Sequence, residues 1–229
     1  MKNTLAILMA VLLVVSMAAC GASPAAGSSS SEASSSEPAS APESSQAESS
    51  SSESEAPAAF ARGAWDGNVF TNEVTGVTLT VPEDWVISSD AELSTQYNIP
   101  VETLQDPEAV LQSAGIPDLT VKSPAGENNI TVVYENTVLS NSQDKGHEEF
   151  AQVLIETFAS IESPKYELQE NTAATVCGHE GTLLKFATTY EGVELDQAMF
   201  IFRAVEGWMG TLTLTTLGGS IDELLAMFA

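Results

Sequence analysis

Hydrophobic and polar residues divide the chain into three stretches of different character. Residues 5–15 are eleven consecutive apolar residues. Residues 21–59 contain no Val, Ile, Leu or aromatic side chain, whereas residues 60–229 mix apolar and polar positions at regular spacings. The pattern predicts a leader, a linker and one folded domain, because about 170 residues suffice for a single hydrophobic core.

The folded stretch begins with the periodicity of strands. Val and Leu alternate with Thr over residues 77–81, which is the two-residue period of a strand with one buried face. Residues 69–71 form a second candidate strand, and residues 73–76 supply the turn of a hairpin. Pro82 ends the run because it has no amide hydrogen for a sheet ladder. A further short strand is predicted at residues 86–87.

Helix signals follow at four places. A Ser-x-x-Glu spacing, which is typical of a capping box, predicts that short helices begin at Ser89 and at Ser220. Asp106 before a proline predicts another short helix, which Gly115 should end. The main helix is predicted over residues 146–161, where apolar residues recur every three or four positions and form one stripe.

The remaining apolar runs predict five more strands. They cover residues 119–122, 130–134, 182–190, 193–203 and 208–216. Tight turns at residues 191–192 and 206–207 make the last three strands antiparallel neighbours. Leucines of the last strand face one side, and its threonines face the other. The order of elements predicts the α+β class, a single domain in which helices pack against an antiparallel β-sheet.

The apolar leader ends at the only cysteine among the first 176 residues, Cys20. Lys2 supplies the positive charge of a secretory signal, and the apolar run is too short to span a bilayer. Met17-Ala18-Ala19-Cys20 resembles the lipobox of bacterial lipoproteins. The resemblance implies a signal peptide over residues 1–19, cleavage before Cys20 and a lipid on Cys20 that holds the protein to the membrane. An ordinary signal peptide is the alternative.

Residues 20–59 are predicted to be a tether between this lipid and the domain. Sixteen of the thirty-nine residues after Cys20 are Ser, six are Glu, and most of the others are Ala or Pro. Such a segment buries too little apolar surface to offset the entropy of ordering, so we expect it to be disordered. Its mean reach is about 35 Å. A plain spacer and a modified Ser-rich stalk are both compatible with this composition.

Charge restricts the partners of the domain. The whole chain carries a formal net charge of −25, and residues 60–229 hold 26 of the 32 acidic and six of the seven basic residues. Phosphate backbones require a basic face, so we expect no nucleic acid partner. The excess of acid favours either solubility at the cell exterior or attraction of cationic ligands.

Candidate catalytic and metal-binding groups are few. Cys177 and His179 form a Cys-x-His pair, but a zinc site needs three or four ligands and the only other histidine is His147. Cys177 is predicted to be a small buried hydrophobe. No nucleophile, phosphate-loop or metalloprotease motif occurs. The sequence therefore predicts no catalytic residue, no metal site and no cofactor.

Acidic clusters and tryptophans complete the candidates. The acids gather at Asp84/Asp90/Glu92, Asp144/Glu148/Glu149 and Asp222/Glu223. Each cluster falls at a predicted helix start, where carboxylates stabilise the helix dipole, so we expect capping instead of acid–base chemistry. Trp85 and Trp208 are predicted to lie in the core. Trp65, beside the tether, fits packing and surface recognition equally.

Residues 76–85, Gly-Val-Thr-Leu-Thr-Val-Pro-Glu-Asp-Trp, resemble the strand-Pro-x-x-Trp opening of PsbP-like domains. The later helix, three-strand meander and terminal helix match the order of elements in that family. The resemblance spans residues 65–229 and implies an antiparallel sheet sandwiched between helices. In photosynthetic relatives the domain assists a membrane complex and is not an enzyme, and related bacterial lipoproteins are mostly of unknown role.

These observations favour a membrane-anchored extracytoplasmic lipoprotein that acts as a non-catalytic interaction or accessory module. Its expected location is the outer face of the cell membrane, in an envelope of the Gram-positive type, with an envelope protein as partner. Binding of a small ligand or a divalent cation is the alternative. An envelope enzyme is the third possibility that the residues leave open.

Overall fold

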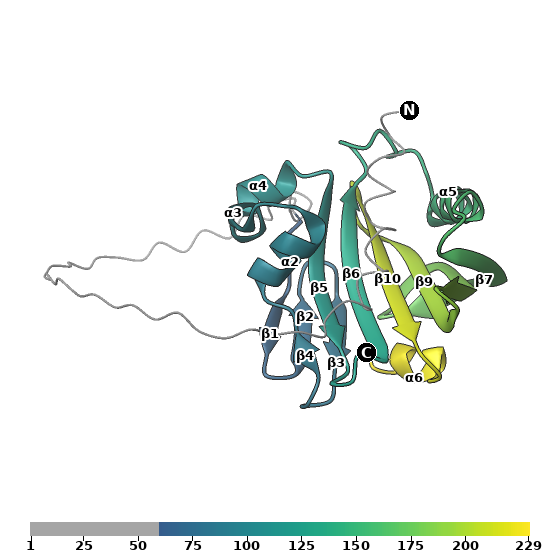
Figure 1. Ribbon diagram of the computed structural model, residues 1–229. Helices are drawn as coiled ribbons and strands as arrows, with labels where there is room; N and C mark the ends of the chain where they lie inside the picture. The colour runs from purple at the N-terminus through teal and green to yellow at the C-terminus, as the bar shows by residue number, and fades with distance from the viewer. Residues whose placement is uncertain (1–59) are drawn as a thin grey trace, which may run out of the picture.

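The computed structural model describes residues 60–229, which build two antiparallel sheets and five helices (Figure 1). The larger sheet has seven strands in the order β4-β5-β6-β10-β9-β8-β7, and the smaller has the order β1-β2-β3. The strands are β1 (Ala64–Asp66), β2 (Val69–Asn72), β3 (Val77–Thr80), β4 (Val86–Ile87), β5 (Gly115–Lys122), β6 (Asn128–Asn136), β7 (Lys165–Val176), β8 (His179–Tyr190), β9 (Val193–Val205) and β10 (Trp208–Thr216). The helices are α2 (Asp90–Tyr97), α3 (Val101–Gln105), α4 (Pro107–Leu111), α5 (His147–Ala159) and α6 (Ile221–Leu225). The α+β class predicted from the sequence is confirmed.

Short turns set the pairing of the long strands. Cys177 and Gly178 both have positive φ, as do Glu191 and Gly192, so two-residue turns join β7 to β8 and β8 to β9. Positive φ at both central positions matches the right-handed twist of the flanking strands. Together with the 206–207 turn, they place four antiparallel strands side by side over residues 165–216.

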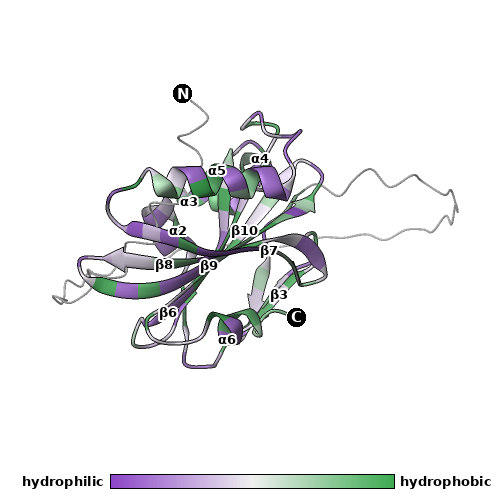
Figure 2. Cartoon of the chain, turned by 90° about the vertical axis from the view of Figure 1, so that its right-hand side faces the viewer, coloured by the Kyte–Doolittle hydropathy of each residue, from purple (hydrophilic) through white to green (hydrophobic). Residues whose placement is uncertain are grey.

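The two faces of the large sheet are covered differently. We call the face that packs against β1–β3 the core face, because its Leu, Ile, Val and Phe side chains form the main hydrophobic cluster. We call the opposite face the helix face. There α5 lies over β7, β8 and β9 (Figure 2). The apolar stripe of α5 packs on Phe186, Met199 and Ile201. A helix and a second sheet thus cover the two faces of one sheet, the arrangement expected of a single domain.

The C-terminus closes the core face. After α6 the chain runs to β3, where Leu79 pairs with Phe228 and the Ala229 amide donates to the Thr78 carbonyl oxygen at 3.2 Å (Figure 1). The segment after α6 is therefore held by backbone hydrogen bonds to β3, the edge strand of the small sheet.

Three elements were not predicted from the sequence. Strand β7 lies at the sheet edge with most side chains exposed, so it lacks the apolar alternation that marks a half-buried strand. Strand β1 and helix α3 are only three and five residues long. Short or exposed elements depend on tertiary contacts and leave little periodic signal.

One predicted helix end and one predicted cap are wrong. Helix α4 ends at Leu111, and Gly115 begins β5, whose pairing with β6 extends the strand toward the N-terminus. Helix α6 begins directly after Ser220, as predicted, but Ser220 makes no side-chain cap. The predicted caps at Ser89 and Asp106 are confirmed, with hydrogen bonds to the amides of Glu92 and Glu108.

The predicted signal peptide, Cys20 and the tether of residues 20–59 lie outside the described residues. Within residues 60–229, no helix has the length and apolar character needed to cross a bilayer.

Candidate functional site: the N-terminal anchor

The chain joins the domain at a buried aromatic residue. Phe60 is 3% exposed, and its ring stacks on Trp208 with 4.0 Å between centroids. A second contact places the Phe60 ring 4.9 Å from the ring of Tyr134. Tyr134 lies on β6 and Trp208 on β10, neighbouring strands of the core face. The first described residue is thus fixed to the centre of the large sheet.

Arg62 ties the same segment to three other elements. Its Nη1 donates to the Asp90 carboxylate of α2 and to the carbonyl oxygen of Leu104 in α3, each at 2.9 Å. Its Nε donates to the Pro117 carbonyl oxygen at 3.1 Å, and its Nη2 to that of Asp118 at 3.2 Å. The planar guanidinium carries several donors in a rigid fork, which is the geometry that such multiple contacts require.

Asp118 is a carboxylate buried within β5. One of its oxygens accepts from the Gly63 amide at 2.8 Å, and the other accepts from Asn72 Nδ2 at 2.8 Å. Arg62 Nε lies 3.8 Å from the first oxygen. Burial raises the pKa of Asp118 to about 6, although Asn72, Gly63 and Arg62 all favour the charged form.

Asn72 extends these contacts into the β2–β3 turn. Its amide nitrogen also donates to the Ala61 carbonyl oxygen at 3.0 Å, and its oxygen accepts from the amides of Val74 and Thr75. The Thr75 hydroxyl lies 2.9 Å from the hydroxyl of Tyr134, the residue whose ring contacts Phe60. We call Phe60, Arg62, Asn72 and Asp118 the N-terminal anchor.

The chemistry of the anchor is structural. Protein donors occupy both oxygens of the buried Asp118 carboxylate, and Arg62 is bound by four acceptors. Perturbed carboxyl groups often mark functional sites, but networks of ions that hold a fold together perturb them equally. The anchor fixes residues 60–63 against both sheets.

Both residues of the Cys-x-His pair contact the β2–β3 hairpin. Cys177 is half-buried at the tip of the β7–β8 turn and packs against the main cluster, and its thiol donates to the Thr78 carbonyl oxygen at 3.6 Å. Burial raises the pKa of this thiol, which lowers its reactivity. His179 Nε2 donates to the Thr75 carbonyl oxygen at 2.5 Å, and the ring lies 4.6 Å from Phe202. Both residues hold the β2–β3 hairpin against β8.

His147 lies elsewhere, at the start of α5, where its Nδ1 is 2.8 Å from the Thr182 hydroxyl. Residues 60–229 contain no group of three or more His, Cys, Asp and Glu side chains placed to hold a metal ion.

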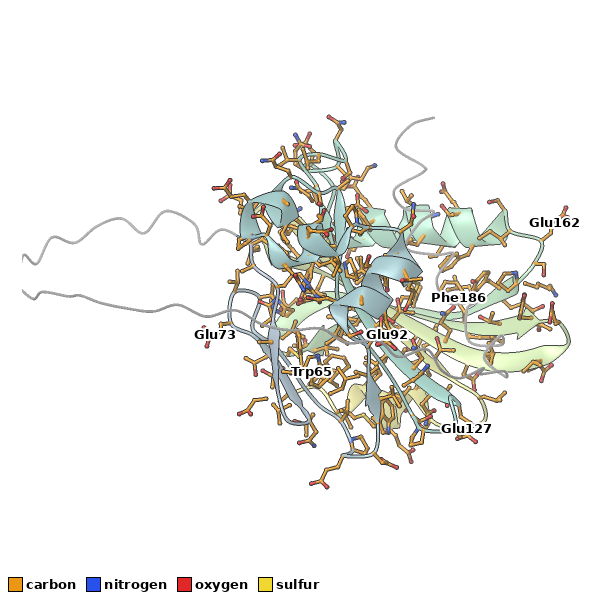
Figure 3. All side chains as sticks on the ribbon, turned by 60° about the vertical axis from the view of Figure 1, so that its left-hand side comes forward. Trp65, Glu73, Glu92, Glu127, Glu162 and Phe186 are labelled. Carbon is orange, nitrogen blue, oxygen red and sulfur yellow. The ribbon has the colours of Figure 1, made fainter. Side chains whose placement is uncertain are left out.

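The acidic clusters perform the predicted capping in two of three places. Glu92 accepts from the Ser89 amide at 2.7 Å, which lowers its pKa (Figure 3). Glu149 accepts from the Gly146 amide at 3.2 Å at the start of α5. Asp90 binds Arg62, and Asp222 binds Lys185, so both act as ion-pair partners.

The tryptophans are packing residues. Trp208 is buried in the core as predicted. Trp85 is half-buried and packs against the main hydrophobic cluster. The Trp85 amide donates to the Pro82 carbonyl oxygen at 3.0 Å, so the Pro-x-x-Trp sequence forms a turn. Trp65 is half-buried, with its ring 5.3 Å from that of Phe70 (Figure 3).

Comparisons with known proteins give similar structures at low identity. No protein-family model and no curated protein matches the chain. CyanoP, the cyanobacterial PsbP of Synechocystis sp. PCC 6803, is 12% identical with a TM-score of 0.43, over 76% of this chain and 99% of that one. LpqN, involved in cell envelope biogenesis of Mycobacterium tuberculosis, is 14% identical with a TM-score of 0.37, over 66% and 75% of the two chains. A protein of unknown function from Pseudomonas aeruginosa, PA94, is 14% identical with a TM-score of 0.34, over 69% and 88%.

Sequence reasoning missed the anchor. Its one visible signal was Asp118, a lone carboxylate in the apolar run 115–121. A charged residue in such a run is rarely fully buried unless it is paired, so it points to a partner elsewhere in the chain. Spacing alone could not identify that partner as Arg62, 56 residues earlier.

Proposed function

We propose that the protein is a lipid-anchored, non-catalytic accessory module on the outer face of the cell membrane. The observation that carries this proposal is the position of the N-terminal anchor. The predicted tether ends at residue 59, and the next residue, Phe60, is already packed in the core. A domain held to a membrane by its N-terminus needs firm attachment at the point where the tether joins it.

The lipid on Cys20 supplies the membrane attachment. Each buried CH₂ of an acyl chain contributes about 0.8 kcal/mol, so two or more chains hold a protein stably. Electrostatics keep the domain away from the lipid surface, because its formal net charge of −20 is repelled by anionic headgroups. The tether then lets the domain meet a partner at some distance from the membrane.

The state of the candidate reactive groups supports a non-catalytic role. The Cys177 thiol has a raised pKa, and both histidines and the buried Asp118 are engaged in contacts that stabilise the fold. A catalytic nucleophile requires the opposite, a lowered pKa and a free position beside a base.

An exposed apolar loop beside the anchor is the part of the surface best suited to a protein partner. Val138 and Leu139 are 56% and 47% exposed in the loop after β6. Asn136 fixes this loop, since its side-chain oxygen accepts from both of their amides. Its amide nitrogen donates to the carbonyl oxygen of Leu111, a third exposed apolar residue. Val138 and Leu139 are adjacent in the chain and both exposed, and exposed apolar surface favours interaction with other proteins.

Two experiments test the proposal. Cys20→Ala should move the protein from the membrane fraction to the soluble fraction, and retention of the variant in the membrane would contradict lipid anchoring. For the accessory role, a photo-crosslinking amino acid at Leu139 should capture one defined envelope protein in intact cells. Leu217, equally exposed at the opposite end of β10, is the matched control position. Equal capture from both positions would contradict a specific partner.

A further inference from the structure

The two edges of the large sheet differ in how well they are protected. At the first edge, the short strand β4 pairs with β5, and the Ser88 amide donates to the Thr120 carbonyl oxygen at 2.9 Å. Arg62 binds two more carbonyl oxygens of β5, those of Pro117 and Asp118. The second edge is β7, which is twelve residues long (Figure 1). Unpaired backbone groups along such an edge are a template for another strand, so an exposed edge of this length calls for an explanation.

Only the first half of β7 carries the devices that keep an edge from pairing. There the Tyr166 ring stacks on Phe158 of α5 with 4.4 Å between centroids, and a bulge at Gln169 interrupts the register with β8. From residue 170 to residue 176 the register with β8 is regular. Four side chains of this second half are exposed, those of Asn171, Thr172, Ala173 and Thr175. We call residues 170–176 the pairing segment.

The backbone of the pairing segment has hydrogen-bonding capacity left over. Alternate residues of an antiparallel strand direct their N–H and C=O groups to one neighbour, and the residues between them direct theirs to the other side. Strand β7 pairs with β8 on one side. Within the described part of the chain, no backbone hydrogen bond joins residues 170–176 to a segment other than β8. The outward N–H and C=O groups are therefore available to a further strand.

Charge indicates which strand fits this edge. The domain carries a formal net charge of −20, which opposes association of two copies over most of the surface. The pairing segment is different, because residues 171–176 are uncharged and its one acid, Glu170, is paired with Lys185 at 3.3 Å. A basic partner strand would thus find no unpaired carboxylate in this segment. A second copy of the same segment would meet no like charge.

The pairing segment is also self-complementary. In a two-fold antiparallel pair, opposed residues lie on the same face of the continued sheet, so each residue pairs with itself or with one an even number of positions away. With Ala173 opposite its own copy, Asn171 lies opposite Thr175, and Glu170 lies opposite Val176. No two acids are opposed in this register. Like charges directly opposite each other destabilise strand pairs, and the pairing segment avoids this cost.

We propose that the protein forms a two-fold symmetric dimer in which the pairing segments of two copies join as antiparallel strands. The large sheet then continues from one domain into the other, with both α5 helices on the same side of it. This interface goes beyond the anchored accessory role. It lies on β7, whereas the apolar loop follows β6, so a dimer can still present that loop to a protein partner.

Analytical ultracentrifugation of the full chain in detergent measures association. We expect a monomer–dimer equilibrium that strengthens as salt rises from about 0.05 M to about 0.5 M, because salt screens the repulsion between two acidic domains. Ala173→Glu combined with Thr175→Glu should weaken dimerisation by about 10-fold, since acids then face each other across the interface. The control combines Ala91→Glu with Ala125→Glu, the same added charge at exposed sites in α2 and the β5–β6 turn, and should stay within about 2-fold of the wild type.

Hydrogen exchange of the wild type locates the contact. Amides of residues 170–176 should exchange more slowly at high than at low protein concentration, whereas those of the loop after β6 should not change. Thermal unfolding checks that the β7 variant is folded, and if it is not, the exchange experiment decides alone. The proposal is overturned if the wild type stays monomeric at about 500 µM, if the β7 variant dimerises as strongly as the control, or if the slower exchange falls on another segment.

Discussion

The Phe60 ring stacks on Trp208 at a centroid distance of 4.0 Å with an interplanar angle of 19°, so the first described residue is part of the core of the large sheet. Aromatic pairs of this kind add about 0.5–1.5 kcal/mol to the free energy gained by burial. The contact joins the N-terminal segment to β10, 148 residues later in the chain.

Phe60→Ala should therefore lower the free energy of unfolding by about 3–5 kcal/mol, the usual loss for a buried Phe. Urea denaturation of the full chain measures this change. Leu217→Ala removes a side chain that is 46% exposed and serves as the control, with an expected change of about 0.5 kcal/mol or less. Equal effects of the two substitutions would show that Phe60 is not anchored as described.

Arg62→Met should lower stability by about 3 kcal/mol, because it leaves the buried Asp118 carboxylate without its cation and leaves three carbonyl oxygens without their donor. Arg62→Lys should not restore the loss, since an ammonium group cannot reach the same set of acceptors. Limited proteolysis provides a local readout: cleavage near residue 62 should accelerate in both variants. Full stability of the Lys variant would contradict the role given to the guanidinium fork.

Stability should depend on pH through Asp118. Its pKa of about 6 in the folded state lies above the ordinary value of 3.8, so between these values the folded state binds more protons than the unfolded state. The contribution of this group to the free energy of unfolding is therefore largest below about pH 4, falls as pH rises to about 6, and is constant above that. The total change is at most about 3 kcal/mol.

Asp118→Asn isolates this contribution from the other carboxyl groups, including Glu135, whose pKa is also raised by burial. The measurement is urea denaturation of both proteins from pH 4 to pH 8. The wild type should gain stability relative to the variant as pH falls from about 6 to about 4. A difference between the two proteins that does not change with pH would contradict the assignment.

Gly210→Ala should destabilise the fold by about 1–3 kcal/mol through overpacking. An added Cβ at this position of β10 would lie 2.4 Å from Cζ of Phe202, whose ring stacks on Phe200 in the core. Thermal unfolding checks the effect. The matched control is Gly115→Ala in strand β5, since a Cβ there comes no closer than 3.8 Å to another atom, the Tyr134 carbonyl oxygen. A melting temperature unchanged by Gly210→Ala would mean that the Phe202 ring can move aside.

Much of the fold could be predicted from local pattern. The leucine–threonine alternation of β10, the turn at residues 191–192 and the apolar stripe of α5 each follow from neighbouring residues, and all three are confirmed. Edge strand β7 could not be predicted in this way, since its pairing with β8 and not its own side-chain pattern makes it a strand.

The anchor shows why sites built from distant residues escape such reasoning. Arg62, Asn72 and Asp118 belong to three segments that local periodicity treats separately. Only the pairing of β5 within the large sheet and of β2 within the small one brings them within hydrogen-bond distance. By contrast, the prediction that Leu212 and Leu214 of β10 face the core depended on neighbouring residues alone, and it is confirmed.

The most direct test of membrane anchoring is the mass of the N-terminal peptide of protein extracted from membranes. No Lys or Arg lies between Lys2 and Arg62, so trypsin should release residues 20–62 of the mature protein as one fragment. We expect this fragment to begin at Cys20 and to carry the mass of a diacylglycerol group or a larger lipid. A fragment that begins at residue 3, or one with an unmodified Cys20, would contradict the lipid-anchored role.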